Sequence, residues 1–162
     1  MELGVVITLF NGASWIEETL RCVFAQTAPP DEIVVVDDGS VDDGAERVAS
    51  FSGVRIVPSL RKRRARYSGL LEVRTPLVAF LDQDDLWHAR HLEGLVAALE
   101  AHADAPAAVA GWAPFYDGEA PIYEPDAEGV TRLDPWSTWP ITCPVTTPSA
   151  VLFRREALEA AG

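Results

Sequence analysis

The chain of 162 residues is 48% hydrophobic and 23% charged, which is the composition of one folded globular domain with a sizeable core. Its formal net charge of −12 argues against a nucleic-acid partner, because phosphates would be repelled over most of the surface. The sequence has no apolar run of 18 residues and no leader pattern, so we expect no membrane span and a cytoplasmic location, with the inner face of the membrane left open. Cys22 and Cys143 stand at no metal-ligand spacing, and we expect both to be reduced core residues.

The first third of the chain alternates apolar runs with a helical pattern. Residues 3–8 and 32–36 are near-continuous apolar runs with many β-branched side chains, which predicts two buried strands. Between them, Ser14 is followed three residues later by Glu17, the spacing of a capping box, and this predicts a helix to about Ala25. A helix between two fully apolar strands predicts a right-handed crossover and parallel strands.

The same alternation continues through the middle of the chain. We expect a helix that Asp42 or Asp43 caps and that ends near Ser50, followed by a strand at 54–57. A helix at 61–73 should come next, with Leu70, Leu71 and Val73 on its buried side, and then a strand that ends at Asp82. The last of these elements is a helix at 88–102, which Asp85 can cap and whose inward residues are Leu92, Leu95, Val96 and Leu99. The predicted fold class is α/β, with a mostly parallel central sheet flanked by helices.

The last third has a different character. Residues 107–112 and 149–153 predict two more strands, and residues 155–161 predict a helix. Between them, residues 113–145 are rich in proline, tryptophan and acids, which predicts a long, packed loop of the kind that is often functional. Trp136 and Trp139 in this loop could stack on a sugar or simply pack the loop.

Acidic side chains follow two of the predicted strands. Asp82, Asp84 and Asp85 come directly after one strand, and Asp37 and Asp38 end another. Parallel strands bring such residues to one edge of the sheet, where α/β proteins bind ligands. A single acidic loop of this kind is more often a solvated helix cap, but a second acidic pair weakens that interpretation. Two carboxylates about 4 Å apart repel by roughly 4 kcal/mol at an effective dielectric near 20, and a divalent cation relieves this repulsion.

Basic residues are concentrated between the two acidic clusters. Seven of them lie within residues 55–74, where Glu72 is the only acid, and this favours a small anionic ligand. A solvated helix face at Arg61 to Arg66 is the plainer alternative. An acidic pair can accept hydrogen bonds from a base or a ribose, and arginines can bind a diphosphate. Mg²⁺ typically uses one or two carboxylates together with phosphate oxygens. The pattern therefore predicts a pocket for a nucleotide diphosphate with a divalent cation.

Four segments together resemble the family 2 glycosyltransferases of the GT-A fold. They are Val5 to Asn11, Val34 to Ser40, Phe80 to Trp87, and Thr147 to Arg155. The resemblance implies an enzyme that transfers a sugar from a nucleotide-diphosphate sugar, UDP- or dTDP-linked, to a saccharide or other hydroxyl acceptor, with inversion, in polysaccharide or glycoconjugate synthesis. It divides the domain into a nucleotide-sugar-binding half at 1–104 and the start of an acceptor-side half at 105–162.

The same resemblance implies roles for individual residues. It implies that the base and the ribose are bound by Thr8, Leu9, Phe10, Asn11 and Asp38. Asp82 and Gln83 would lie along the ribose and diphosphate, and Arg61 or Arg66 would approach the nucleotide. Asp84 would be the ligand of Mn²⁺ or Mg²⁺. The family's catalytic base lies in an acidic motif some tens of residues beyond Gly162, so we identify no catalytic base and expect a donor-binding part that is truncated before that segment. A homodimer is left open.

The sequence departs from the family pattern at two places. Phe10 stands where a tyrosine is usual, and Tyr67 follows Arg66 where an asparagine is usual. The main alternative is a non-catalytic nucleotide-sugar-binding module. A nucleotidyltransferase would need a glycine-rich loop with a basic residue after the first strand, and a nicotinamide dehydrogenase would need Gly-x-Gly-x-x-Gly there. Residues 8–12 match neither. We expect Trp87 to be a packing residue, and His88 and His91 not to bind zinc.

Overall fold

The computed structural model describes residues 1–61, 64–111 and 147–161. In chain order its elements are β1 (Leu3–Leu9), α1 (Ile16–Phe24), β2 (Glu32–Asp37), α2 (Gly44–Ala49), β3 (Val54–Pro58), α3 (Ala65–Glu72), β4 (Leu77–Asp82), α4 (His91–Ala101), β5 (Ala107–Val109), a 3-10 turn (Pro148–Ala150), β6 (Val151–Arg154) and α6 (Arg155–Ala161). The loop at 113–145, Trp112, Cys143 and the two tryptophans at 136 and 139 lie outside the described residues.

The strands form one six-stranded sheet in the order β3-β2-β1-β4-β6-β5. The first four strands in this order pair in parallel, whereas β6 runs antiparallel to both β4 and β5. This confirms the predicted α/β class with a mostly parallel sheet. Because β1 lies between β2 and β4, Leu9 pairs with Asp37 on one side and Thr8 with Asp82 on the other. The two acidic strand ends therefore flank a single neutral strand.

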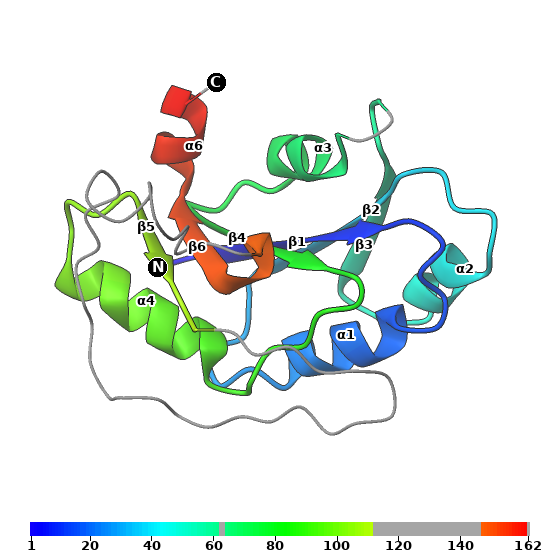
Figure 1. Ribbon diagram of the computed structural model, residues 1–162, viewed down its shortest axis with the longest axis horizontal. Helices are drawn as coiled ribbons and strands as arrows, with labels where there is room; N and C mark the ends of the chain where they lie inside the picture. Colours follow the sequence, from blue (N-terminus) through cyan, green and yellow to red (C-terminus); the bar gives the residue numbers. More distant parts are fainter. Residues whose placement is uncertain (62–63, 112–146, 162) are drawn as a thin grey trace, which may run out of the picture.

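Helices cover both faces of the sheet (Figure 1), with α1, α2 and α4 on one face and α3 and α6 on the other. Alternate residues of β1 point to opposite faces, as the period of a strand requires. Val5 and Ile7 belong to the larger apolar cluster, on the side of α1 and α4. Val6 belongs to a smaller cluster together with Ala65 of α3. Burial on both faces explains why the parallel strands read as continuous apolar runs.

Helix α3 contacts the sheet through small residues. Ala65, Ser68 and Gly69 are its buried residues, so the backbone of the helix lies close to β1 and β2. The helix begins at Ala65, later than predicted, and ends at Glu72. Leu71 was predicted to be buried but is 44% exposed, because the shorter helix turns its small residues to the sheet instead.

Two predicted helix caps are wrong. At α1 the N-cap residue is Trp15, not Ser14, and no side-chain hydrogen bond caps the helix. The amides of Trp15 and Ile16 instead donate to the carbonyl of Gly12 in the turn before the helix. This turn displaces Ser14 from the capping position. Asp85 does not cap α4, since this helix begins only at His91. At α2, Asp43 is the N-cap residue but makes no side-chain cap hydrogen bond; Oδ1 of Asp42, one residue earlier, accepts from the amide of Gly44 at 3.1 Å.

Within the described ranges, no helix is both long enough and apolar enough to cross a bilayer.

Candidate functional site

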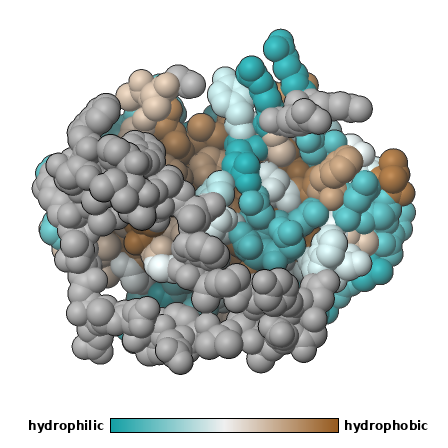
Figure 2. Space-filling model, viewed as in Figure 1, coloured by the Kyte–Doolittle hydropathy of each residue, from teal (hydrophilic) through white to brown (hydrophobic). Residues whose placement is uncertain are grey.

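A cleft of about 800 Å³ opens where β1, β2 and β4 end. It is lined by Thr8, Leu9, Phe10, Asp38, Arg64, Ala65, Arg66, Tyr67, Asp82, Gln83 and Asp84. Figure 2 shows hydrophilic side chains over the middle of the molecule, in the region where β1 and β4 end in Figure 1. The structure thus brings Asp38 and Asp84, which follow different strands, to one cleft.

Most of the residues selected from the sequence line this cleft, but two do not. Asn11 and Arg61 are not among the lining residues, although both were predicted to contact the nucleotide. Conversely, Arg64, Ala65 and Tyr67 line the cleft without having been selected. A prediction that α3 begins at Ala65 could have found them, because the first turn of this helix then lies at the carboxyl ends of the strands.

Asp82 is bound by groups from three parts of the chain. Its Oδ1 accepts a hydrogen bond from the Thr8 hydroxyl at 3.0 Å and from Nη2 of Arg66 at 2.5 Å. Its amide donates to the hydroxyl of Ser149 at 3.0 Å. The side chains of Arg66 and Asp82 are 45% and 27% exposed, so the ion pair adds on the order of 1 kcal/mol or less to stability. The pair instead fixes Arg66 against the acidic end of β4.

Gln83 holds the loop after β1 in place. Its Oε1 accepts from the amide of Phe10 at 2.7 Å, and its Nε2 donates to the carbonyl of Phe10 at 3.0 Å. A Cβ on residue 12 would come within 2.5 Å of Cδ of Gln83, so glycine is required at Gly12 for this contact. Both ends of the Gln83 amide are engaged with backbone, which makes this side chain a brace between the ends of β1 and β4.

A second set of contacts joins the loops after β1 and β2. Asp37 accepts from the amide and the hydroxyl of Ser40, at 2.9 and 2.6 Å. The Ser40 hydroxyl in turn accepts from the amide of Asn11 at 3.0 Å, and Oδ1 of Asn11 accepts from the amide of Val41 at 2.9 Å. Asn11 has φ of 49°, a left-handed conformation that asparagine tolerates better than most residues. Asp37 and Asn11 therefore shape the loops, whereas Asp38 lines the cleft.

Trp87 packs beneath the acidic loop, as predicted. It is 7% exposed, its Nε1 donates to the carbonyl of Ser149 at 2.6 Å, and its ring stacks on His91 with centroids 4.9 Å apart. Burial lowers the pKa of His91 to about 4, so this ring is neutral near pH 7. The amide of Trp87 also donates to Sγ of Cys22 at 3.3 Å, and burial raises the pKa of this thiol to about 11. The loop that carries Asp82 to Asp84 thus rests on a buried aromatic support.

The donor set of the cleft fits a hard divalent cation. Asp84 is exposed and lines the cleft beside Asp82, and both offer carboxylate oxygens. Among the described residues, no group of three or more His, Cys, Asp or Glu side chains is arranged to hold a metal ion unaided. A cation here would take its remaining ligands from a phosphate-bearing substrate and water, which is the usual arrangement for Mg²⁺.

The fold is that of the GT-A class: an α/β sheet with a cleft at the ends of strands that acidic residues follow. Residues 4–162 match the profile of Glycosyl transferase family 2, and the chain belongs to this family. It is 32% identical over 155 residues to validoxylamine A glucosyltransferase of Streptomyces hygroscopicus subsp. limoneus, a match that covers 83% of this chain and 34% of that protein.

Solved structures share the fold. TarS residues 1–349 of S. aureus superpose with a TM-score of 0.78 at 19% identity, over 99% of this chain and 49% of that one. The mannosyltransferase PcManGT of Pyrobaculum calidifontis, in complex with GDP-Man and Mn²⁺, gives a TM-score of 0.74 at 22% identity, over 99% and 46% of the two chains. This chain spans about a third or less of the length of curated relatives that it matches, and about half of these solved chains.

Proposed function

We propose that this chain contains the donor-binding site of a metal-dependent, inverting glycosyltransferase that moves a sugar from a nucleotide-diphosphate sugar to an acceptor hydroxyl. The observation that carries the proposal is the shared cleft of Asp38 and Asp84, with Arg66 beside them. Family membership supports the reaction class. Residues 1–104 supply the donor side in this proposal, and residues 105–162 begin the acceptor side.

The cleft offers a division of labour among its side chains. Asp38, at the end of β2, would accept hydrogen bonds from the base or ribose, and the exposed ring of Phe10 would cover the base. Asp84 would hold the Mn²⁺ or Mg²⁺ ion together with the diphosphate oxygens. When bound, this ion would supply Lewis-acid stabilisation of the leaving diphosphate, an effect worth several kcal/mol. Arg66 and Arg64 would add positive charge on the opposite side of the diphosphate.

Arg66 has two partners in this scheme. In the structure, its guanidinium pairs with Asp82. A bound diphosphate would present a second, stronger anionic partner to the same group, and Asp82 would then be left to Thr8 and the ribose hydroxyls. In an inverting transfer the acceptor oxygen attacks the anomeric carbon while the bond from that carbon to the diphosphate oxygen breaks, and a base takes the acceptor proton. No residue is assigned as this base.

The proposed donor carries one of three nucleotides, UDP, dTDP or GDP. The sequence predicts a UDP- or dTDP-linked donor. Relatives support nucleotide ligands of more than one kind, since TarS of S. aureus has been solved with UDP and with UDP-GlcNAc, and PcManGT with GDP-Man. The test is a thermal-shift panel of UDP-glucose, UDP-GlcNAc, dTDP-glucose and GDP-mannose, each with Mn²⁺ or with EDTA.

We expect at least one donor to raise the Tm in Mn²⁺ and to have a smaller effect in EDTA. A ligand at 100 times its Kd stabilises the native state by about 2.7 kcal/mol, which corresponds to roughly 5–10 °C for a chain of this size. Asp38→Ala should reduce the shift and keep its dependence on Mn²⁺. If no donor shifts the Tm under either condition, the proposal is wrong. An unchanged shift in Asp38→Ala would refute the base and ribose assignment alone.

A further inference from the structure

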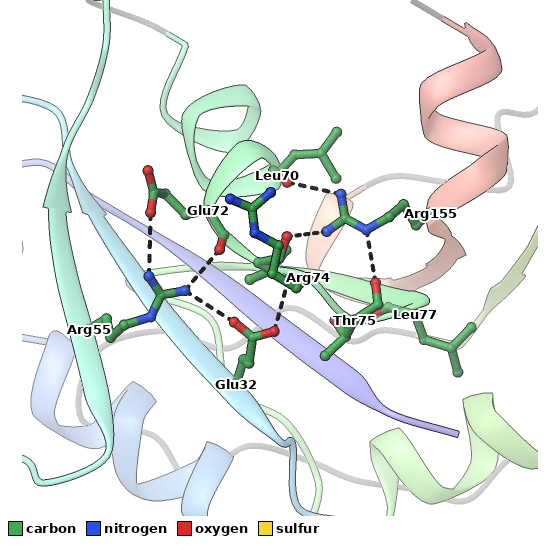
Figure 3. Close-up of polar contacts among 9 residues, drawn as sticks. Glu32, Arg55, Leu70, Glu72, Arg74, Thr75, Leu77 and Arg155 are labelled. Atoms are coloured by element: carbon green, nitrogen blue, oxygen red, sulfur yellow. Dashed lines mark hydrogen bonds and ion pairs between the residues drawn. The ribbon is translucent and has the colours of Figure 1, made fainter.

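Two consecutive arginines, the last residue of β6 and the first residue of α6, reach helices on opposite faces of the sheet. Arg155 donates from Nε to the carbonyl of Thr75 at 2.9 Å, from Nη1 to that of Leu70 at 3.2 Å, and from Nη2 to that of Val73 at 2.5 Å. Figure 3 shows this guanidinium at the end of α3, pointing from α6 toward the last turn of that helix. All three of its nitrogens are thus occupied by the carbonyls at and just after the C-terminus of α3.

Arg155 supplies hydrogen-bond donors and a positive charge at the C-terminus of α3. The last carbonyls of a helix have no partner within the helix, and the partial negative charge there favours a cation. The side chain of Arg155 is only 19% exposed, so these bonds lie largely out of water. A planar guanidinium with donors in a fixed fork can hold three carbonyls at once and so fixes the position of the helix end.

The opposite side of the same helix end is held by a second arginine. Arg55 of β3 donates to the carbonyl of Glu72 at 2.9 Å, and it pairs with the carboxylates of Glu72 and Glu32 at 3.3 and 3.1 Å (Figure 3). These carboxylates are 44% and 25% exposed, so this side of the network is the wetter one. The C-terminus of α3 therefore lies between Arg55 on the sheet edge and Arg155 on α6.

The other end of α3 lies at the cleft. Its first residues Ala65, Arg66 and Tyr67 are lining residues, and Arg66 pairs with Asp82. The helix is eight residues long, about 12 Å, and small side chains join it to the sheet. A rigid rod of this length that is held at one end transmits a shift of that end to the other.

We propose that Arg155 is a positioning residue for nucleotide binding: by fixing the C-terminus of α3, it sets the place of Arg66 and Tyr67 in the cleft. The inference rests on the proposed function, because it names the cleft as a nucleotide site. Arg155 itself lies outside the cleft lining; its bonds to Leu70 and Val73 hold the end of α3, and its bond to Thr75 holds the segment that follows the helix. The groups that it places are Arg66 and Tyr67, and Tyr67 lines the cleft and is 51% exposed.

Arg154 is a matched control. Its Nε donates to the carbonyl of Ala105 at 2.9 Å and its Nη2 to that of Leu99 at 2.8 Å, at the end of α4 on the other face of the sheet. No residue of α4 is among the residues that line the cleft in the described part of the chain. Two neighbouring arginines thus make the same kind of contact, and only one of the two helices reaches the cleft.

The test compares Arg155→Gln, Arg155→Lys and Arg154→Gln in this chain by titration with UDP, dTDP and GDP, each with Mn²⁺. We expect Arg155→Gln to weaken binding by about tenfold, because displacements near 1 Å at a binding group are known to have large effects. Arg155→Lys, which keeps the charge beside the carbonyls, should recover part of this loss. Arg154→Gln should bind within about twofold of the unchanged chain, a difference well below the tenfold that corresponds to 1.4 kcal/mol.

A double variant and hydrogen exchange separate positioning from general destabilisation. In an Arg66→Gln background, Arg155→Gln should cause little further loss of affinity, since both act on the same contact. Amide exchange should accelerate at residues 65–72 in Arg155→Gln and at residues 91–101 in Arg154→Gln. If Arg155→Gln is unfolded at the assay temperature, Arg155→Lys carries the comparison.

The possible failures are distinguishable. If the unchanged chain binds none of UDP, dTDP and GDP, the proposed function is wrong and the role of Arg155 in binding falls with it, whatever the exchange pattern. If the chain binds one of them but Arg155→Gln and Arg154→Gln weaken it equally, or neither weakens it, the proposed function survives and the positioning role of Arg155 is overturned.

Discussion

Replacing Gly69 by alanine tests how closely α3 packs on the sheet. A Cβ at this position would overlap Cγ1 of Val6 and lie 3.0 Å from Cγ2 of Val36, where ordinary carbon contacts are about 3.5–4.0 Å. Both valines are fully buried β-branched residues with restricted χ1 rotamers, so neither side chain can simply turn aside. The helix or the strands must therefore shift.

The expected cost follows from this geometry. Overpacking of a buried site costs about 1–3 kcal/mol, and an overlap as severe as that with Val6 belongs at the upper end, about 2–3 kcal/mol. The better helix propensity of alanine returns about 1 kcal/mol of this. We expect Gly69→Ala to lower the free energy of unfolding by about 1–2 kcal/mol and the Tm by roughly 2–8 °C. Urea and thermal unfolding followed by circular dichroism measure both quantities.

Gly94 in α4 is the matched control for this prediction. No atom lies within 4 Å of a Cβ built there, so Gly94→Ala gains helix propensity without a clash. It should raise the free energy of unfolding by about 0.5–1 kcal/mol. The packing of α3 described above is refuted if Gly69→Ala is as stable as the unchanged chain, or if the two variants shift stability in the same direction.

Three further predictions concern the supports of the cleft. The pKa of His91 falls from 6.5 to about 4 on folding, so its neutral ring contributes stability that is complete above pH 6.5 and is lost as the pH falls toward 4. The slope of Tm against pH in this window should therefore flatten in His91→Phe and persist in the control His102→Gln. Burial raises the pKa of Cys22 to about 11, so iodoacetamide at pH 8 should alkylate this thiol much more slowly in the native chain than after unfolding, and equally rapid labelling of the Cys22 peptide in both states, seen by mass spectrometry, would contradict the raised pKa. Gln83→Glu keeps the size of the side chain but sets a carboxylate oxygen against the Phe10 carbonyl, so it should lose about 1–3 kcal/mol in urea unfolding, and a change below 0.5 kcal/mol would argue against the brace.

The parallel core of the fold follows from local patterns in the sequence. The strands β1, β2 and β4 are buried on both faces, and such strands need continuous apolar runs that can be recognised without the structure. The acids follow β2 and β4, and parallel strands of one sheet end at one edge, so the proximity of Asp38 and Asp84 could be predicted, although the structure places β1 between the two strands. The resemblance to a known family then supplied the roles proposed for them.

Other features depend on contacts between distant segments, which a local pattern does not contain. The insertion of β6 between β4 and β5, antiparallel to both, depends on pairings such as Ala79 with Leu152. The brace by Gln83 joins it to Phe10, 73 residues away. The capping box at Ser14 failed because the Gly12 carbonyl took the first amides of α1. In each case a long-range contact or a backbone turn prevailed over the local signal.

The central claim is that the acids following β2 and β4 form one site for a metal-bound diphosphate. The most direct measurement is calorimetric titration of the chain with UDP and with GDP, in Mn²⁺ and in EDTA, repeated with Asp84→Ala. We expect Mn²⁺ to tighten binding at least about tenfold, equivalent to 1.4 kcal/mol, in the unchanged chain and to have no effect in Asp84→Ala. Equal affinity in Mn²⁺ and EDTA, or an undiminished Mn²⁺ effect in Asp84→Ala, would contradict the claim.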